Sequence, residues 1–525
     1  QLKELCMVAL SANIRSKPDW WNKFKDPVIR ARWKAEALSS TMLKLTLSEA
    51  QVEYVLEELE GYRRLLDEVS GIQVSCFDGV WQSDSLISQN VRDALVEAVY
   101  PLENVPEEMK DWHPHSNNLV LDIVHPSLYC VVYGRTLAHL SPHTEQASGV
   151  LQTVTAPAKL NARLLISNRF QWLPTDFVVS ETGEVTALGY INNIHPTHKS
   201  LYKSVENILS CFIPMFERVL TDLRYDDNPL PHRISGDYFS INHDLDKRYP
   251  KEEYADTETF WEAWENEKTV FLPDIPKEGY TGGLESRKCV VKLRGRNIQV
   301  IVKLANIHLT PQKPQYGGGT WHVEGMANEA IVASGICYYD NENVSDSELA
   351  FRVAVEEPLP STQIQAEPYD YYAHKVQWGM RDTTSELNQC AGAVSTTSGR
   401  CIAFPNTYQH RVSSFELMDP TKPGHRKILA FFLVDPDQPP IPSTSIVPPQ
   451  QVAWARDALL ECAADPKSRM HLLPPEIVTL ITDTSDMMDD EEAKDIRLKL
   501  MDERSSKLGD EDKDVFARRF NLCEH

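Results

Sequence analysis

The segment from Arg426 to Asp435 most constrains the fold, because it predicts a strand that is covered on both sides. One face of this strand would carry Arg426, Ile428, Ala430 and Phe432, and the other would carry Leu429, Phe431 and Leu433. Beyond Arg426 and Lys427 at the start of the strand, both faces are apolar, so each face needs a covering layer. We expect the N-terminal helical segments to supply the outer one.

Apolar segments of strand length also recur upstream. Residues Lys288–Arg294 and Ile298–Leu304 flank a Gly-containing loop and predict a hairpin. Further strands are expected at residues 320–324, 331–339, about 350–355, 400–404 and 426–434. This series is typical of a double-sheet jelly roll, a cupin-like double-stranded β-helix. The predicted fold class is therefore α+β, with a jelly-roll core and large N- and C-terminal helical extensions.

These patterns divide the chain into four segments. Residues 1–230 are expected to be mainly helical and to pack on the core, and Ser48 with Gln51 has the capping-box pattern of a helix start. Residues 231–287 are polar, and we interpret them as a connecting insertion. Residues 288–450 would form the jelly-roll catalytic core, and residues 451–525 the C-terminal helices.

His322 and Glu324 are the first candidate site residues. They follow a Gly-rich turn, and their i, i+2 spacing would put both side chains on one face of a strand. An imidazole and a carboxylate on one face are two of the three ligands of a facial triad for non-haem iron(II). His410 is the candidate for the third ligand. Arg426, on the last strand, would be buried, and a buried arginine needs an anion.

The His-x-Glu pattern alone is weak. With 16 His and 76 acidic residues, roughly two such matches are expected by chance. A second match, His143 with Glu145, lies in a polar stretch that we interpret as a solvated loop. The match at His322 differs in having a Gly-rich entry, an apolar strand after it, and His410 and Arg426 further on.

Composition limits the partners of the chain. The net charge of −23 argues against a nucleic-acid partner and against an anionic membrane surface. No apolar run approaches the length of a membrane span, so no membrane association is expected. The ten Cys are scattered without a Cys-x-x-Cys pair, which favours free thiols in a cytoplasmic protein. The oligomeric state does not follow from the sequence.

Several long motifs resemble a fungal family described as "domain of unknown function 4246". They are Lys17–Trp20, His125–Tyr129, Tyr190–Pro196, Ile307–Gly325, Phe404–Val412 and Asp419–Lys427. The resemblance covers nearly the whole chain, and the family name implies no activity.

The β-rich part is more distantly similar to the iron(II)/2-oxoglutarate oxygenase superfamily. That resemblance implies iron(II) held by His322, Glu324 and His410, with O₂ and 2-oxoglutarate as cosubstrates and Arg426 on the far carboxylate of 2-oxoglutarate. Tyr316 and Trp321, beside the ligands, could line the cosubstrate or substrate pocket. Two departures are a Glu in place of the commoner Asp and a longer interval between His410 and Arg426, which we interpret as a loop insertion.

Three functions remain open from the sequence. The first is an oxygenase that uses iron(II) and 2-oxoglutarate on a small-molecule substrate. The second keeps the iron but has the substrate itself chelate the metal, with Arg426 holding its acid group. The third is a jelly-roll binding or scaffold protein without catalysis.

Strand alternation points Lys427 away from Arg426, so Lys427→Ala is expected to be nearly silent.

Overall fold

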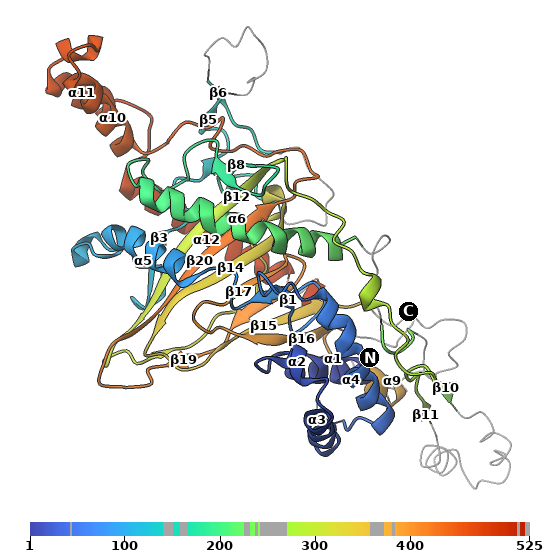
Figure 1. Cartoon of the computed structure of the whole chain (residues 1–525). Helices are drawn as coiled ribbons and strands as arrows, with labels where there is room; N and C mark the ends of the chain where they lie inside the picture. The colour runs from blue at the N-terminus through green and yellow to red at the C-terminus, as the bar shows by residue number, and fades with distance from the viewer. Residues whose placement is uncertain are drawn as a thin grey trace, which may run out of the picture.

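The computed structural model describes residues 1–41, 45–139, 151–157, 166–224, 232–236, 240–241, 270–356, 372–380, 384–511 and 515–519. The His143–Glu145 match and residues 242–269 of the predicted insertion lie outside this part of the chain. The protein is a mixed α/β structure with antiparallel sheets, and the large sheet forms the middle of the molecule (Figure 1).

The large sheet has the strand order β1-β2-β17-β14-β20-β12-β8-β9, and β3 pairs with β12 as well. Its strands are β1 (Gln73–Val74), β2 (Trp81–Ser83), β3 (Val120–Val124), β8 (Thr175–Val179), β9 (Val185–Ala187), β12 (Asn297–Leu309), β14 (Ile331–Glu342), β17 (Cys401–Pro405) and β20 (Gly424–Val434). The predicted strands at 331–339, 400–404 and 426–434 are thus confirmed. Strands from the N-terminal third extend the sheet at both edges.

A smaller sheet has the order β16-β15-β18, formed by β15 (Glu348–Ala354), β16 (Asn388–Ser395) and β18 (Gln409–Val412). His322 adds one isolated bridge to His410 of β18. Four two-stranded sheets complete the described strands: β4 (Val131–Val132) with β7 (Phe170–Gln171), β5 (Leu137–Ala138) with β6 (Gln152–Thr153), β10 (Ser240–Ile241) with β11 (Val270–Phe271), and β13 (Gln315–Tyr316) with β19 (Phe415–Glu416).

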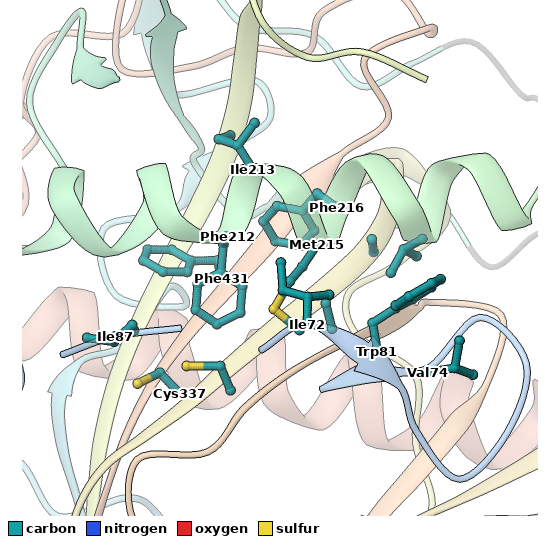
Figure 2. Close-up of a cluster of buried hydrophobic side chains, with 14 of the residues drawn as sticks. Ile72, Val74, Trp81, Ile87, Phe212, Ile213, Met215, Phe216, Cys337 and Phe431 are labelled. Atoms are coloured by element: carbon teal, nitrogen blue, oxygen red, sulfur yellow. The ribbon is translucent and has the colours of Figure 1, made fainter. Parts of the chain in front are cut away.

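The two faces of β20 bury different clusters. Phe432 and Ala430 belong to an inner cluster that includes Phe351 of the smaller sheet. Phe431 and Leu429 belong to the outer cluster, which α6 (Lys199–Asp222) covers. Phe431 packs edge-on against Phe212 of this helix, with ring centroids 5.5 Å apart (Figure 2). The expectation that a helix of the N-terminal region covers the outer face is confirmed.

Gly335 of β14 permits this close approach of α6. A Cβ atom at this position would lie 2.8 Å from Phe212 and 2.9 Å from Phe216, closer than carbon atoms can pack. The side chains of Phe212 and Phe216 therefore pack directly on the strand backbone at this point. Any larger residue at Gly335 would push α6 off the sheet.

Apart from α9, which lies between β15 and β16 in the sequence, the remaining helices precede or follow the β-rich part of the chain (Figure 1). They are α1 (Leu2–Arg15), α2 (Trp20–Lys23), α3 (Pro27–Ser39), α4 (Glu49–Leu65), α5 (Gln89–Glu103), α9 (Tyr372–Trp378), α10 (Val452–Ala464), α11 (Pro475–Asp483) and α12 (Asp490–Glu511). The predicted capping box is confirmed, because the Gln51 N–H donates to Ser48 Oγ and the Ser48 N–H donates to Gln51 Oε1. Short 3₁₀ turns cover residues 107–109, 284–286, 327–329 and 469–472.

Helix α12 contributes to the inner cluster. Ile496 and Leu500 are buried in it together with Phe432 and Phe404. Arg504 of the same helix lies over the ring of Trp172, 3.7 Å from its centroid, and pairs with the fully buried Glu329. The C-terminal helix thus contributes its buried face to the inner cluster.

Two predicted strands are wrong. Residues 288–294 form no strand, because side chains of α6 take up their backbone donors: Thr221 Oγ1 accepts from the N–H groups of Val290 and Val291, and Glu217 from that of Leu293. β12 pairs with β8 in place of the predicted hairpin partner. Residues 320–324 make only the bridge at His322, because three glycines precede it and a bend follows at Glu324.

Within the described residues, the structure has no helix that is both long and apolar enough to cross a membrane.

Candidate metal centre and anion site

The backbone at His322 is fixed by β18. The His322 N–H donates to the His410 carbonyl at 3.2 Å, and the His410 N–H donates back to the His322 carbonyl at 2.9 Å. Gly318 makes this approach possible: it has φ +88°, and a Cβ there would lie 2.9 Å from the Val412 carbonyl oxygen. The Gly-rich entry therefore lets residues far apart in sequence place two imidazoles side by side.

The side chains of His322, Glu324 and His410 converge. Glu324 Oε1 lies 3.6 Å from His322 Nε2 and 3.4 Å from His410 Nε2, and the two imidazole centroids are 4.3 Å apart. Neighbouring ligands around a metal with bonds of about 2.1 Å are about 3 Å apart. The three donor atoms therefore have nearly the spacing that one metal ion requires, and the donor set of two imidazoles and a carboxylate suits iron(II).

Hydrogen bonding also selects the atoms that face the centre. His322 Nδ1 lies 2.8 Å from the Thr320 carbonyl oxygen, which accepts only if Nδ1 carries the proton. This leaves Nε2 as the free ligand atom, the arrangement common in metal-binding histidines. Asn406 fixes the backbone of Glu324 from the other side, by hydrogen bonds in both directions.

The three groups also shift one another's pKa values. Burial would raise the pKa of Glu324, but hydrogen bonds from His322 and His410 outweigh it and hold the pKa well below its usual range. Burial and then the charge of His322 lower the pKa of His410. Burial would lower the pKa of His322, but the hydrogen bond to Glu324 outweighs it and raises that pKa. Without a metal, His322 therefore shares its Nε2 proton with the ionised Glu324 beside a neutral His410, and a metal ion would take the place of that proton.

Arg426 lies inside the protein, as the sequence predicts. Its side chain is 1% exposed, with the guanidinium 4.0 Å above the centre of the Phe415 ring. It donates to Ser347 Oγ and, at 3.4 Å, to the Ser345 carbonyl, while Nε has no acceptor among the described residues. No carboxylate of the described residues pairs with it, and Asp346 acts only as a Coulomb neighbour. A buried cation without an acid partner is a candidate site for an anion.

The other two predicted pocket residues, Tyr316 and Trp321, lie in different surroundings. Tyr316 packs on Phe415, with ring centroids 5.1 Å apart, and is an electrostatic neighbour of Arg426. Trp321 instead lies between two guanidinium groups, 5.0 Å from Arg352 and 4.7 Å from Arg411. On β15, Arg352 follows Phe351, and on β18, Arg411 follows His410, so the two arginines lie on the sheet face opposite to His410. Because Trp321 contacts these two arginines, it faces away from the predicted ligands.

Lys427 points away from Arg426 as predicted, but it is not an isolated surface residue. It is 8% exposed, and its Nζ lies 2.9 Å from Glu103 of α5 and 3.6 Å from Asp340. Its replacement by Ala would take the ammonium group away from Glu103 and remove one of the two basic partners of Asp340, the other being His425. The expectation that Lys427→Ala is silent therefore does not fit the structure.

A second group was missed by sequence reasoning. His113, Asp122 and His125 also place possible ligand atoms close together, and His113 Nδ1 lies 2.8 Å from Asp122 Oδ2. This group differs from the first because Arg497 already lies 3.6 Å from the same Asp122 oxygen. His125 Nδ1 accepts from the Ser127 N–H, and burial lowers the pKa of His125 to about 3. We interpret it as a buried ion-pair network.

Sequence comparison places the chain in a family. The model of "Protein of unknown function (DUF4246)" matches residues 49–458, and that of "Domain of unknown function DUF4246, N-terminal" matches residues 1–36. The chain belongs to the DUF4246 family. Its predicted ligands and Arg426 all lie inside the larger match. No curated protein matches this DUF4246 chain.

Two solved structures are distantly similar to this DUF4246 protein. One is a selenomethionine-labelled Fe(II)/α-ketoglutarate-dependent dioxygenase, TqaL, with 10% identity and a TM-score of 0.22, covering 50% of this chain. The other is a bsmA homologue from Methylobium petroleophilum PM1, with 11% identity and a TM-score of 0.16, covering 28% of this chain. The chain spans less than two thirds of either structure, 65% and 46% respectively.

Proposed function

We propose that this protein is a non-haem iron(II)- and 2-oxoglutarate-dependent oxygenase with a jelly-roll core, acting on a small-molecule substrate. The observation that carries the proposal is the pairing of two features in one interior. One is a convergent group of His322, Glu324 and His410, and the other is a buried Arg426 without a carboxylate partner among the described residues.

The strand order supports a jelly roll. Strands β12, β20, β14 and β17 are neighbours in the large sheet, while β16, β15 and β18 form the smaller one, which His322 extends by its bridge. Along the chain, the core passes from β12 and β14 in the large sheet to β15 and β16 in the smaller one, back to β17, then to β18 and finally to β20, as in a double-stranded β-helix. The inner cluster contains residues of both sheets.

The ligand geometry supports metal chemistry. Three protein ligands on one face of an iron(II) ion leave positions for a 2-oxoacid and O₂, and the bound metal would supply oxidation coupled to decarboxylation of that acid. Glu324 supplies the negative charge that holds the metal. Arg426 would orient the cosubstrate by a forked pair with its far carboxylate. Tyr316 and Phe415, packed beside Arg426, would keep water from this end.

The test combines metal analysis with cosubstrate binding and turnover. The purified protein, reconstituted with iron(II) under anaerobic conditions, should bind one iron per chain and one 2-oxoglutarate, and should release succinate on exposure to O₂. Arg426→Ala should keep the iron and lose the succinate. Iron binding without any 2-oxoglutarate binding would favour direct chelation by the substrate, and a chain that binds no metal would favour a binding protein.

A further inference from the structure

Lys303 is the one charged side chain on the inner face of β12. It pairs with Ala430 of β20, and its neighbours on the same face of β12 include Ile301 and Ile307. Ile301 and Ala430 belong to the inner cluster, and Ile307 pairs with Arg426. Strand alternation therefore directs Lys303 into the same interior as Arg426.

The charge of Lys303 reaches the predicted ligands. Burial has the largest influence on the pKa values of His322 and His410, and the Lys303 ammonium adds a smaller downward contribution to both. It makes the same kind of contribution at His125. These contributions agree with the inward position of Lys303 on β12, whose partner strand β3 carries Asp122 opposite Ala305.

Lys303 forms no close ion pair in the part of the chain that the structure describes, although its charge is one of the influences that lower the pKa of Asp122 against the effect of burial. No hydrogen bond or ion pair joins its ammonium group to a described residue, although the side chain is half-buried. Asp122 Oδ2 already meets His113 and Arg497, while Asp122 Oδ1 has no hydrogen-bond partner among the described residues. Glu324 faces the two imidazoles. A metal cation at the centre would repel the lysine further unless an anion lay between them.

Two cations on one inner face suit a ligand that has two acidic ends. Lys303 pairs with Ala430, four residues along β20 from Arg426, so the two backbone positions are about 13 Å apart. Long lysine and arginine side chains can reach toward each other across this interval. Arg426 lies at the Ser345–Ser347 end, and Lys303 is the cation whose charge acts on His322 and His410.

We propose that Lys303 is a second anion-binding residue of this site, whose ammonium group binds the metal-chelating carboxylate of the 2-oxoacid while Arg426 binds the far carboxylate. This inference rests on the proposed function. Lys303 would neutralise the charge of the acid at the metal and fix which of its two ends chelates.

The experiment uses two probes on the full chain loaded with manganese(II), which avoids turnover. Oxalate has adjacent carboxylates that can chelate a metal but has no far carboxylate, whereas 2-oxoglutarate has both ends. Dissociation constants are measured by calorimetry. Lys303→Met should raise the Kd of both probes at least tenfold, and Lys303→Arg should restore part of the affinity. Arg426→Met should raise the Kd of 2-oxoglutarate alone. Exposed Lys292→Met is the control.

Binding of manganese separates a ligand role from a structural one. Removing a cation next to the metal should leave the manganese Kd unchanged or lower it, with an unchanged melting temperature. Equal oxalate affinity in the wild type and Lys303→Met would overturn the proposal, as would a loss of manganese together with thermal stability. A third outcome separates the inference from the proposed function. If Lys303→Met weakens oxalate binding, but 2-oxoglutarate binds no more tightly than oxalate and Arg426→Met leaves its Kd unchanged, the role of Lys303 stands and 2-oxoglutarate is not the cosubstrate.

Discussion

Glu324 and Asn406 hold each other by two hydrogen bonds of 2.8 Å: the Glu324 N–H donates to Asn406 Oδ1, and Asn406 Nδ2 donates to the Glu324 carbonyl. The same amide also donates to the Ile331 carbonyl, at 3.1 Å. One side chain from the segment after β17 thus fixes both the candidate ligand and the start of β14.

Asn406→Ala should therefore weaken metal binding without removing a ligand. Partners that orient metal ligands typically contribute about 10–100-fold in affinity, so we expect an increase of that size in the metal Kd, measured by competition with a chelator. Gln299→Ala is a matched control. Gln299, near the start of β12, makes the same two-way pair of hydrogen bonds with the backbone of Ile441. The control should lose stability but keep its metal affinity.

The metal count should be one per chain. His322→Ala, Glu324→Ala and His410→Ala should each weaken binding by more than the ~100-fold that an orienting partner can contribute. His113→Gln should leave the count at one, because Arg497 already neutralises Asp122. Elemental analysis of the purified variants measures this. A wild-type count of two that falls to one in His113→Gln would show that the second group is a metal site.

Arg426→Ala should raise the Kd of 2-oxoglutarate by at least about 30-fold, since losing one partner of a buried charge pair costs about 2–5 kcal/mol. Arg426→Lys should recover little of the affinity for 2-oxoglutarate, because an ammonium group lacks the planar, two-pronged shape of the guanidinium group. Arg411→Ala is the control: it lies next to His410 on the opposite face of β18, beside Trp321. Calorimetry with the manganese-loaded protein distinguishes the three variants, and equal loss in Arg411→Ala would contradict the assignment.

His125 should make the protein sensitive to acid. Its pKa is about 3 in the folded protein, lowered mainly by burial, against an ordinary value of 6.5. Between these pH values only the unfolded chain takes up the proton, so the free energy of unfolding falls as pH decreases, by about 1.4 kcal/mol per pH unit. His125→Asn should flatten the dependence between pH 6 and about 4. Ser127→Ala, which keeps the imidazole, should retain the wild-type slope in denaturant unfolding.

Gly335→Ala should destabilise the protein by about 1–3 kcal/mol, because the added methyl group would overlap Phe212 and Phe216. Gly236→Ala is the control, since a Cβ there meets no atom within 4 Å. Phe212→Leu added to Gly335→Ala should recover part of the loss by making room. Thermal unfolding measures all three variants, and an unchanged melting temperature in Gly335→Ala would contradict the packing of α6.

The sequence predicted the features that depend on local pattern. Alternation identified β20 and the inward position of Arg426, and the capping box located the start of α4. The convergence of His322 and Glu324 followed from their spacing even though residues 320–324 form no regular strand, because one bridge to His410 fixes the backbone.

The features that depend on distant partners were missed. The 288–294 segment has strand-like alternation, but Thr221 and Glu217, on a helix some 70 residues earlier, bind its backbone donors. Asn406 lies in a recognised motif, yet only the structure shows what it holds. Lys303 had a local signal, a lone charge in an apolar strand, whose meaning required the register with Ala430.

The position of α12 has a consequence for biosynthesis. Ile496 and Leu500 complete a hydrophobic interior whose strands begin at Asn297, so ribosomes release the last of the packing residues some 200 residues after the first strand of the core. While the residues between β12 and α12 are being synthesised, a nascent chain would expose this apolar interior. Exposed apolar surface makes a partly folded chain prone to aggregation. A chain truncated before α12 should therefore depend on chaperones in the cell.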